Sequence, residues 1–176
     1  VLIDETTNEI VVPNGTMGDR HTNPQKWNLR LENRNTGAKI DPRLSVFDQR
    51  EDVTVVKLPY FGDEEHEGVI ERAIPTITVQ TVDGPVKVTT VYDLILANYG
   101  IDRGIGGEVA TSYTDDTPYT PTWQEKITGV KADIAIATAR EFADNAEKTK
   151  GRSMIIMGGG INHWYHADII YRTILN

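Results

Sequence analysis

The residues with the clearest chemical potential lie near the end of the chain, where the glycine run Gly158, Gly159 and Gly160 precedes Asn162 and His163. Glycine has no Cβ, so the backbone N–H groups of such a run can approach a ligand closely. A helix that begins after the run would point its positive N-terminal end at the same place. This pattern favours a phosphate or pyrophosphate group. The alternative is that the glycines only make a tight turn between a strand and a helix.

Other chemistries fit this stretch less well. A dinucleotide site of the NAD type needs G-x-G-x-x-G, and counted from Gly158 and Gly160 the third glycine position holds His163. His163 and His166 are spaced to share a helix face, but the sequence shows no third metal ligand beside them. The acidic run at 63–67, which contains His66, is typical of a solvated surface loop. We therefore predict neither a catalytic residue nor a metal ligand on this chain.

The elements that must position this stretch follow an α/β order. Residues 131–146 carry an apolar stripe at helical spacing, and residues 153–157, with the sequence SMIIM, predict a buried strand. Residues 162–175 predict a second helix, for which Asn162 is also a suitable N-cap. Helix, connector, strand, glycine turn and helix are the order of a parallel α/β layer, and such layers bind ligands at the carboxyl ends of their strands.

The part of the chain before these elements predicts strands, loops and one helix. Residues 53–58 predict a strand, and residues 76–82 and 86–90 predict an antiparallel hairpin with Asp83-Gly84 at its tip. Residues 91–99 predict a helix that Thr90 caps. We expect an α/β fold with a mixed or parallel sheet, flanking helices, a hairpin near 76–90 and an irregular N-terminal third. The expected parts are a strand-and-loop part at 1–75 and an α/β cofactor-binding part at 76–176.

Composition excludes several classes of function. The 176 residues carry a net charge of −8, which argues against a general nucleic-acid surface and against electrostatic attachment to anionic lipid. No apolar run approaches the ~18 residues of a membrane span, so we expect no direct membrane insertion. The chain has no cysteine, which excludes disulfides and cysteine-ligated metals or clusters on it. Because the sequence begins at Val1 and stops inside a predicted helix, we expect an internal piece of a longer protein.

Several motifs, in order along the chain, resemble the alpha subunit of the respiratory nitrate reductases, a branch of the molybdopterin oxidoreductases or DMSO-reductase superfamily. The most specific is GRSMIIMGGGINHWYHAD at 151–168, which is similar to the cofactor-binding segment of that branch. The others are LPYFG at 58–62, VTTVYDL at 88–94, ANYG at 97–100, ATSY at 110–113, YTP at 119–121 with Trp123, ITGV at 127–130 and AREFADNA at 139–146. The resemblance covers nearly the whole chain.

The resemblance implies a catalytic subunit that reduces nitrate to nitrite with electrons from quinol. It implies molybdenum held by two molybdopterin guanine dinucleotides, a 4Fe-4S cluster, an iron–sulfur beta subunit and a cytochrome b gamma subunit. The location implied is the cytoplasmic face of the cell membrane, through those partner subunits. Matching the glycine turn to the family places Gly158, Gly160, Asn162 and His163 at the guanine dinucleotide and pterin.

The departures from the family pattern limit what this chain can do alone. The family's N-terminal iron–sulfur motif uses cysteine ligands, which this chain lacks, and the molybdenum-ligating aspartate of the branch lies upstream of the matched region. We therefore expect the isolated chain to bind no cofactor and to be inactive. Two alternatives stay open: a relative that acts on chlorate, perchlorate, selenate or an S-oxide, and a non-catalytic scaffold that binds a protein through the loop at 101–121.

Overall fold

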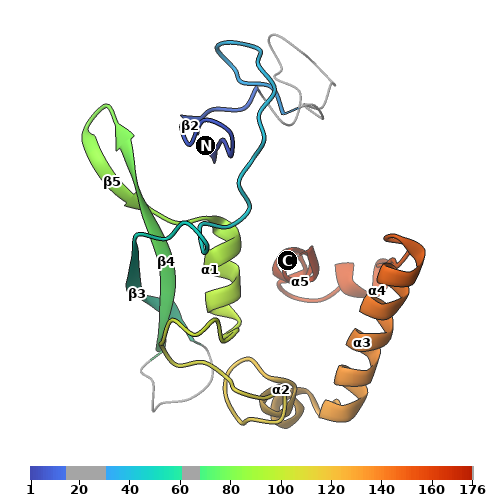
Figure 1. Cartoon of the computed structure of the whole chain (residues 1–176). Coiled ribbons are helices and arrows are strands. Elements are labelled where there is room, and N and C mark those ends of the chain that lie inside the picture. Colours follow the sequence, from blue (N-terminus) through green and yellow to red (C-terminus); the bar gives the residue numbers. More distant parts are fainter. Residues whose placement is uncertain (15–30, 61–67, 176) are drawn as a thin grey trace. The chain divides into compact units, whose positions relative to one another are not determined.

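The computed structural model describes residues 1–14, 31–60 and 68–175. Its contacts divide the chain into two compact units, Val1–Asn98 with Arg103–Gly107, and Tyr99–Asp102 with Glu108–Asn176. Helices and two small antiparallel sheets make up the regular structure, which confirms the expected mixture of α and β (Figure 1). The division expected after residue 75 lies inside a strand of the first unit, Val69–Thr81. The acidic run at 63–67 lies outside the described residues.

The larger sheet belongs to the first unit and has the order β3-β4-β5. Strand β3 (Asp52–Pro59) confirms the strand expected at 53–58 and pairs antiparallel with β4 (Val69–Thr81), with Val55 opposite Ala73. Strand β5 (Gly84–Val88) pairs with the other edge of β4, with Ile77 opposite Val88. The alternation of apolar and polar residues that predicted these strands therefore corresponds to their two faces.

The hairpin expected near 76–90 is confirmed as the β4–β5 connection. Thr81 pairs with Gly84, so Val82 and Asp83 form the turn, one position earlier than the Asp83-Gly84 tip that the sequence predicts. Gly84 has φ +108° at the start of β5, a conformation that residues with a Cβ rarely adopt. The Thr81 hydroxyl donates to the Gly84 carbonyl at 2.8 Å and closes the turn.

A cluster of buried apolar residues packs on one face of β4 in the first unit. Val46, Ile77 and Val79 are buried together. A second, two-stranded sheet of β1 (Leu2–Ile3) and β2 (Ile10–Val11) places Ile3 and Ile10 against that cluster. The irregular N-terminal part is thus tied to the regular sheet by apolar burial, the main stabilising contribution in folding.

Threonine side chains cap the first turns of two helices, α1 and α2. Helix α1 (Val91–Asn98) begins after Thr90, whose hydroxyl accepts from the Asp93 N–H at 3.1 Å. Helix α2 (Pro121–Thr128) begins after Thr120, which caps the Trp123 N–H at 3.2 Å. Helix α3 (Ala132–Thr149) confirms the helix expected at 131–146 and extends it. These caps are side chain to backbone bonds over a few residues, so they are readable from the sequence.

The predicted parallel layer is not present among the described residues. Residues 153–157 form no strand, and the sole parallel pairing that the structure describes is an isolated bridge between Ile101 and Ala110. A strand needs a neighbour to satisfy its backbone N–H and C=O groups, and the described part of the chain places none beside 153–157. The buried strand that the apolar pattern predicts at 153–157 is therefore wrong for the described chain.

The single helix expected at 162–175 is also wrong. The structure has a short helix, α4 (Gly159–Asn162), and a separate helix, α5 (Ala167–Leu175). His166 lies between them with φ +62°, which interrupts a right-handed helix. Glycine is a poor helix former because ordering it costs more backbone entropy, which helps to keep α4 to 4 residues.

One glycine in the first unit lies so close to a neighbouring strand that a side chain would not fit. Gly107 forms a bridge with Arg72 of β4, and a Cβ at Gly107 would lie 2.7 Å from the Ala73 backbone nitrogen. Its neighbour Gly106 has nearly the same positive φ, +92° against +91°, but a Cβ there meets nothing within 4 Å. Substitutions at Gly106 and Gly107 can therefore separate the cost of a left-handed backbone conformation from the cost of close packing.

We expect Gly107→Ala to destabilise the first unit by about 3 kcal/mol, because it adds both left-handed strain and a clash with backbone that a rotamer change cannot relieve. Gly106→Ala should cost about 1 kcal/mol, from the strain alone. Hydrogen exchange of the β4 amides in each variant measures the difference. Equal losses in the two variants would show that the β4 contact contributes nothing.

Candidate cofactor-binding site

The glycine run at 158–160 is not crowded by any described residue. Gly158 is the N-cap of α4 in an extended conformation, with φ −128° and ψ −169°. None of Gly158, Gly159 and Gly160 has a left-handed φ, and a Cβ added to any of them meets nothing within 4 Å. Neither conformation nor crowding within the described chain therefore requires glycine at these positions. The run leaves space beside its backbone for a group from outside the chain.

Asn162 takes a different place from the one expected. It is the last residue of α4, and not an N-cap, since Gly158 caps this helix. Its side-chain oxygen accepts a hydrogen bond from the Tyr171 hydroxyl of α5. The side chain is thus held between the two short helices while the residue as a whole stays exposed.

His163 follows Asn162 and ends α4, with its backbone N–H donating to the Ile161 carbonyl. The imidazole is exposed. His166 lies beyond the helix break, where its ring contacts Tyr165 with the centroids 4.0 Å apart. Among the described residues no group of three or more histidines and acids could hold a metal ion, so the His163–His166 pair has no metal-site support there.

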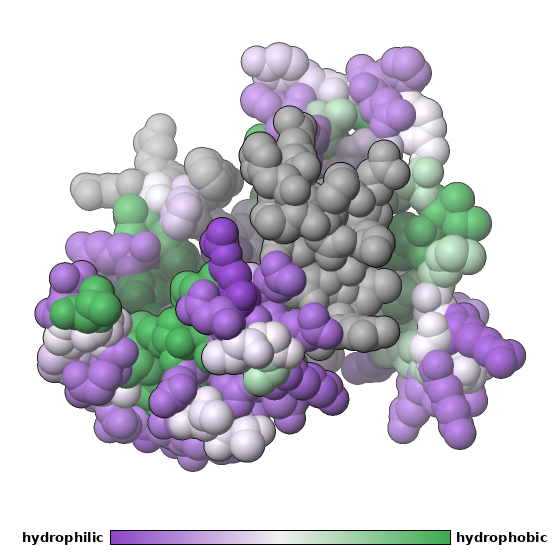
Figure 2. Space-filling model, turned by 90° about the horizontal axis from the view of Figure 1, so that it is seen from above, coloured by the Kyte–Doolittle hydropathy of each residue, from purple (hydrophilic) through white to green (hydrophobic). Residues whose placement is uncertain are grey.

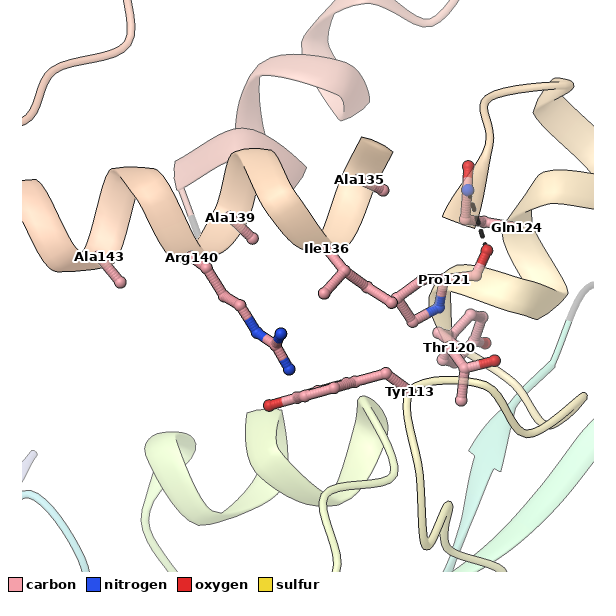
Figure 3. Close-up of a pocket in the computed structure, with 10 residues that line it drawn as sticks. Tyr113, Thr120, Pro121, Gln124, Ala135, Ile136, Ala139, Arg140 and Ala143 are labelled. Carbon is pink, nitrogen blue, oxygen red and sulfur yellow. Dashed lines mark hydrogen bonds between the residues drawn. The ribbon is translucent and has the colours of Figure 1, made fainter. Parts of the chain in front are cut away.

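The second unit also contains a pocket that the sequence analysis missed. It has a volume of about 450 Å³ and lies between the α2–α3 corner and the preceding loop (Figure 3). Its walls include Tyr113, Thr120 and one side of α3, along which Ala135, Ala139 and Ala143 lie. None of the four predicted site residues lines it. The only advance signal was the length of the loop at 101–121, since long ordered loops are often functional.

The pocket is lined by aromatic, aliphatic and amide side chains together with one arginine. The Arg140 guanidinium extends over the Tyr113 ring, 5.8 Å from its centroid (Figure 3). The side-chain amide of Gln124 donates to two backbone carbonyls, that of Pro121 at 2.9 Å and that of Val130 at 2.8 Å. Among the described residues that line it, none is a carboxylic acid, a histidine or a thiol.

The α2–α3 corner beside this pocket is fixed by one carboxylate. Glu125 accepts from the Ala132 N–H at 2.9 Å, and so caps the next helix, and from the Lys131 ammonium at 2.7 Å. The Lys131 hydrogen bond, aided by the Ala132 N–H, lowers the pKa of the Glu125 carboxyl. Gly129 makes the turn between the helices at φ +74°. The ITGV motif at 127–130 therefore lies at a structurally defined corner.

A buried carboxylate in the first unit was also missed. Asp93 is 1 % exposed, and its oxygens accept from the Arg103 guanidinium at 2.5 Å and the Ser45 hydroxyl at 2.7 Å. The Val46 N–H and the Thr90 hydroxyl complete the set, at 2.9 and 2.7 Å. The spacing of Thr90 and Asp93 resembles a capping box, which was the available sequence signal.

The electrostatics of this cluster are those of a structural ion pair. Burial alone would raise the pKa of Asp93, but the hydrogen bonds from Arg103, Ser45, Val46 and Thr90 together hold the pKa below its usual value. Arg103 also lies over the Phe47 ring, 4.0 Å from its centroid. Since both carboxylate oxygens are engaged, Asp93 has no free capacity to act as a base.

Comparison with known proteins agrees with the motifs. The chain is 49% identical over 173 residues to the nitrate reductase alpha chain of Bacillus subtilis, a match that covers 98% of this chain. It is 47% identical over 181 residues, and 97% of this chain, to the respiratory nitrate reductase 1 alpha chain of Escherichia coli. The chain belongs to the nitrate reductase alpha-chain family. The resemblance read from the motifs is thereby confirmed.

The matches cover only a small part of each relative. The chain spans 14% of the length of each of these two relatives. The alpha subunit of a perchlorate reductase from Dechloromonas aromatica is 46% identical over 55 residues, or 31% of this chain. No protein-family model matches the chain. Within the described part of the nitrate reductase segment, no helix combines the length and apolarity that crossing a membrane requires.

Proposed function

We propose that the protein containing this chain is a catalytic subunit that reduces nitrate to nitrite. The observation that carries the proposal is the 49% identity, over 98% of the chain, to a protein named nitrate reductase alpha chain. The match to the perchlorate reductase subunit covers only 31% of the chain, against 98% for the nitrate reductase alpha chain. This difference in coverage favours nitrate over perchlorate as the substrate. Electrons from quinol would arrive through an iron–sulfur beta subunit and a cytochrome b gamma subunit, at the cytoplasmic face of the membrane.

We further propose that Gly158, Gly160, Asn162 and His163 hold part of a molybdopterin guanine dinucleotide. The open space beside the glycine run supports this, because nothing within the described chain requires glycine there. When bound, the cofactor supplies the molybdenum and its two-electron redox chemistry.

The residues of this chain would bind and orient the dinucleotide. Backbone N–H groups at Gly158 and Gly160 would donate to anionic oxygens, while the Asn162 amide and the His163 imidazole offer further polar contacts. Because α4 has only 4 residues, individual N–H groups and not a long helix dipole would supply the attraction. A 4Fe-4S cluster would be held elsewhere in the subunit, because this chain has no cysteine.

The test is substrate choice by the complete subunit. With a reduced dye as electron donor, we expect nitrite from nitrate at a kcat/KM at least 10-fold above that for chlorate, perchlorate or selenate. A higher kcat/KM for perchlorate would support the alternative relative, and no reduction of any oxyanion would support the scaffold. The isolated 176-residue chain should bind no molybdenum. Stoichiometric molybdenum in the isolated chain would contradict the proposal that this chain supplies only part of the cofactor site.

A further inference from the structure

A hydrogen bond between side chains joins the two helices that follow the glycine run. The Tyr171 hydroxyl of α5 donates to the side-chain oxygen of Asn162, the last residue of α4. The two residues are 9 positions apart, and the chain turns between them at His166, where φ is +62°. Because a left-handed residue interrupts the helix there, α5 can return toward α4 and bring Tyr171 to Asn162.

Apolar packing does little to fix these two helices. No residue of α4 or α5 whose burial the structure describes is buried. Ile169 is 54% exposed and Ile174 is 36% exposed. Figure 2 shows hydrophobic side chains at the surface among hydrophilic ones. Since packing is sparse, the hydrogen bond from the half-buried Tyr171 is the contact that sets the orientation of the Asn162 side chain.

The direction of this bond decides which end of the Asn162 amide stays available. An asparagine side chain carries an oxygen that accepts hydrogen bonds and a nitrogen that donates two. Tyr171 occupies the oxygen, and the structure gives the amide nitrogen no hydrogen-bond partner among the described residues. Asn162 therefore presents donors, and not its acceptor, to a group that approaches from outside the chain.

The backbone beside Asn162 also presents donors. The first N–H groups of a helix have no acceptor within the helix, and in α4 they belong to the glycine run. Residues 153–163 contain no acidic side chain. A surface of several donors suits a ligand region made of acceptor oxygens, as an anionic diphosphate is. A guanine edge carries both donors and acceptors, so it matches such a surface less well.

We propose that Tyr171 is a positioning residue, which orients the Asn162 amide to donate to an anionic oxygen of the dinucleotide diphosphate. The inference rests on the proposed function, in which Asn162 contacts the guanine dinucleotide. It adds a residue that the sequence analysis does not single out. Tyr171 acts through Asn162 and does not touch the cofactor itself. Without its hydroxyl, the Asn162 amide is free to turn its oxygen toward the diphosphate.

Tyr171→Phe in the complete subunit removes the hydroxyl and keeps the ring. We expect the content of molybdenum, and of guanine nucleotide released by acid hydrolysis, to fall about 5-fold, the usual effect of one hydrogen bond. Circular dichroism, the nitrate KM and the turnover per bound molybdenum should match the wild type. Tyr92→Phe is the matched control, because the structure describes no hydrogen bond of this 40% exposed tyrosine's hydroxyl, and it should keep full cofactor content.

Asn162→Asp tests the anionic acceptor. The carboxylate can still accept from the Tyr171 hydroxyl, so α4 and α5 stay joined, but it places a negative charge against the diphosphate. We expect the cofactor content to fall about 10-fold or more, and further than in Asn162→Ala, because like charges repel. A loss no larger than that of the alanine variant would overturn the proposal, since the acceptor would then be a neutral group.

A double variant separates positioning from a purely structural role. If Tyr171 acts through Asn162, Tyr171→Phe should lower the cofactor content of the wild type but should not lower that of Asn162→Ala any further. Equal losses in the two backgrounds would overturn the proposal, and so would full cofactor content in Tyr171→Phe. In a wild type that holds guanine nucleotide and reduces nitrate, either result refutes the positioning role alone. A wild type without guanine nucleotide would refute the proposed function as well.

Discussion

Replacing Gly160 by valine in the complete subunit is expected to abolish nitrate reduction, by 100-fold or more, because the branched side chain fills the space that the cofactor needs. In the described chain a Cβ at Gly160 meets nothing within 4 Å, so the fold itself should accept the change. The loss should therefore appear as missing molybdenum in a subunit that is still folded. Elemental analysis and circular dichroism of the purified variant measure the two quantities.

Two further variants make this expectation specific. Ala137→Val adds the same branched side chain at an exposed position of α3 and should leave molybdenum content and turnover unchanged. His163→Ala removes an exposed imidazole and should lower turnover while leaving the subunit folded. Full molybdenum content and wild-type turnover in Gly160→Val would show that the glycine run has only a structural role.

Asp93→Asn is expected to destabilise the first unit by about 3–5 kcal/mol, the usual cost of removing one partner from a buried ion pair. Asp93 is 1 % exposed, and the substitution leaves the Arg103 guanidinium without its counter-charge. The amide also places donors where Ser45, Thr90 and the Val46 N–H already donate. Hydrogen exchange of the β4 amides, which report on opening of this unit, measures the loss.

Asp52→Asn provides the control for this prediction. Asp52 pairs with Lys87 in the same unit, but both side chains are more than half exposed, so solvent screens the pair and its loss should destabilise the unit far less than the loss of Asp93. If the Asp52 and Asp93 variants lose the same free energy of unfolding, burial does not make the Asp93–Arg103 pair more stabilising than the exposed Asp52–Lys87 pair.

The same cluster should give a distinct acid dependence. The pKa of Asp93 lies below the ordinary value of 3.8 in the folded chain, so its stabilising contribution is complete above that value. The contribution is lost as pH falls from that value through the lowered folded pKa, because over this range the unfolded state binds a proton on Asp93 and the folded state does not. Asp4 and Asp52 also have lowered pKa values and add to the slope. The Asp93→Asn variant should therefore show a shallower acid dependence below about pH 4.

Much of the fold could be predicted because its signals are local. The hairpin depended on alternating side chains beside a turn, and the turn moved by a single position. Helix α1 followed from Thr90, whose cap acts over three residues. The family followed from motifs along nearly the whole chain. The division of the chain and the cofactor assignment of Gly158 and His163 stay predictions.

What the sequence alone determined is thus the set of local elements and the family, since turn chemistry, caps and motifs reside in neighbouring residues. Only the tertiary structure decided the contacts between distant residues. Asp93 meets Ser45 across 48 positions, and Gly107 meets Arg72, because packing of the first unit brings them together. The apolar run at 154–157 shows the same principle in reverse. Its side chains specify burial, but a strand forms only where another segment supplies hydrogen-bond partners, and the described chain places none there.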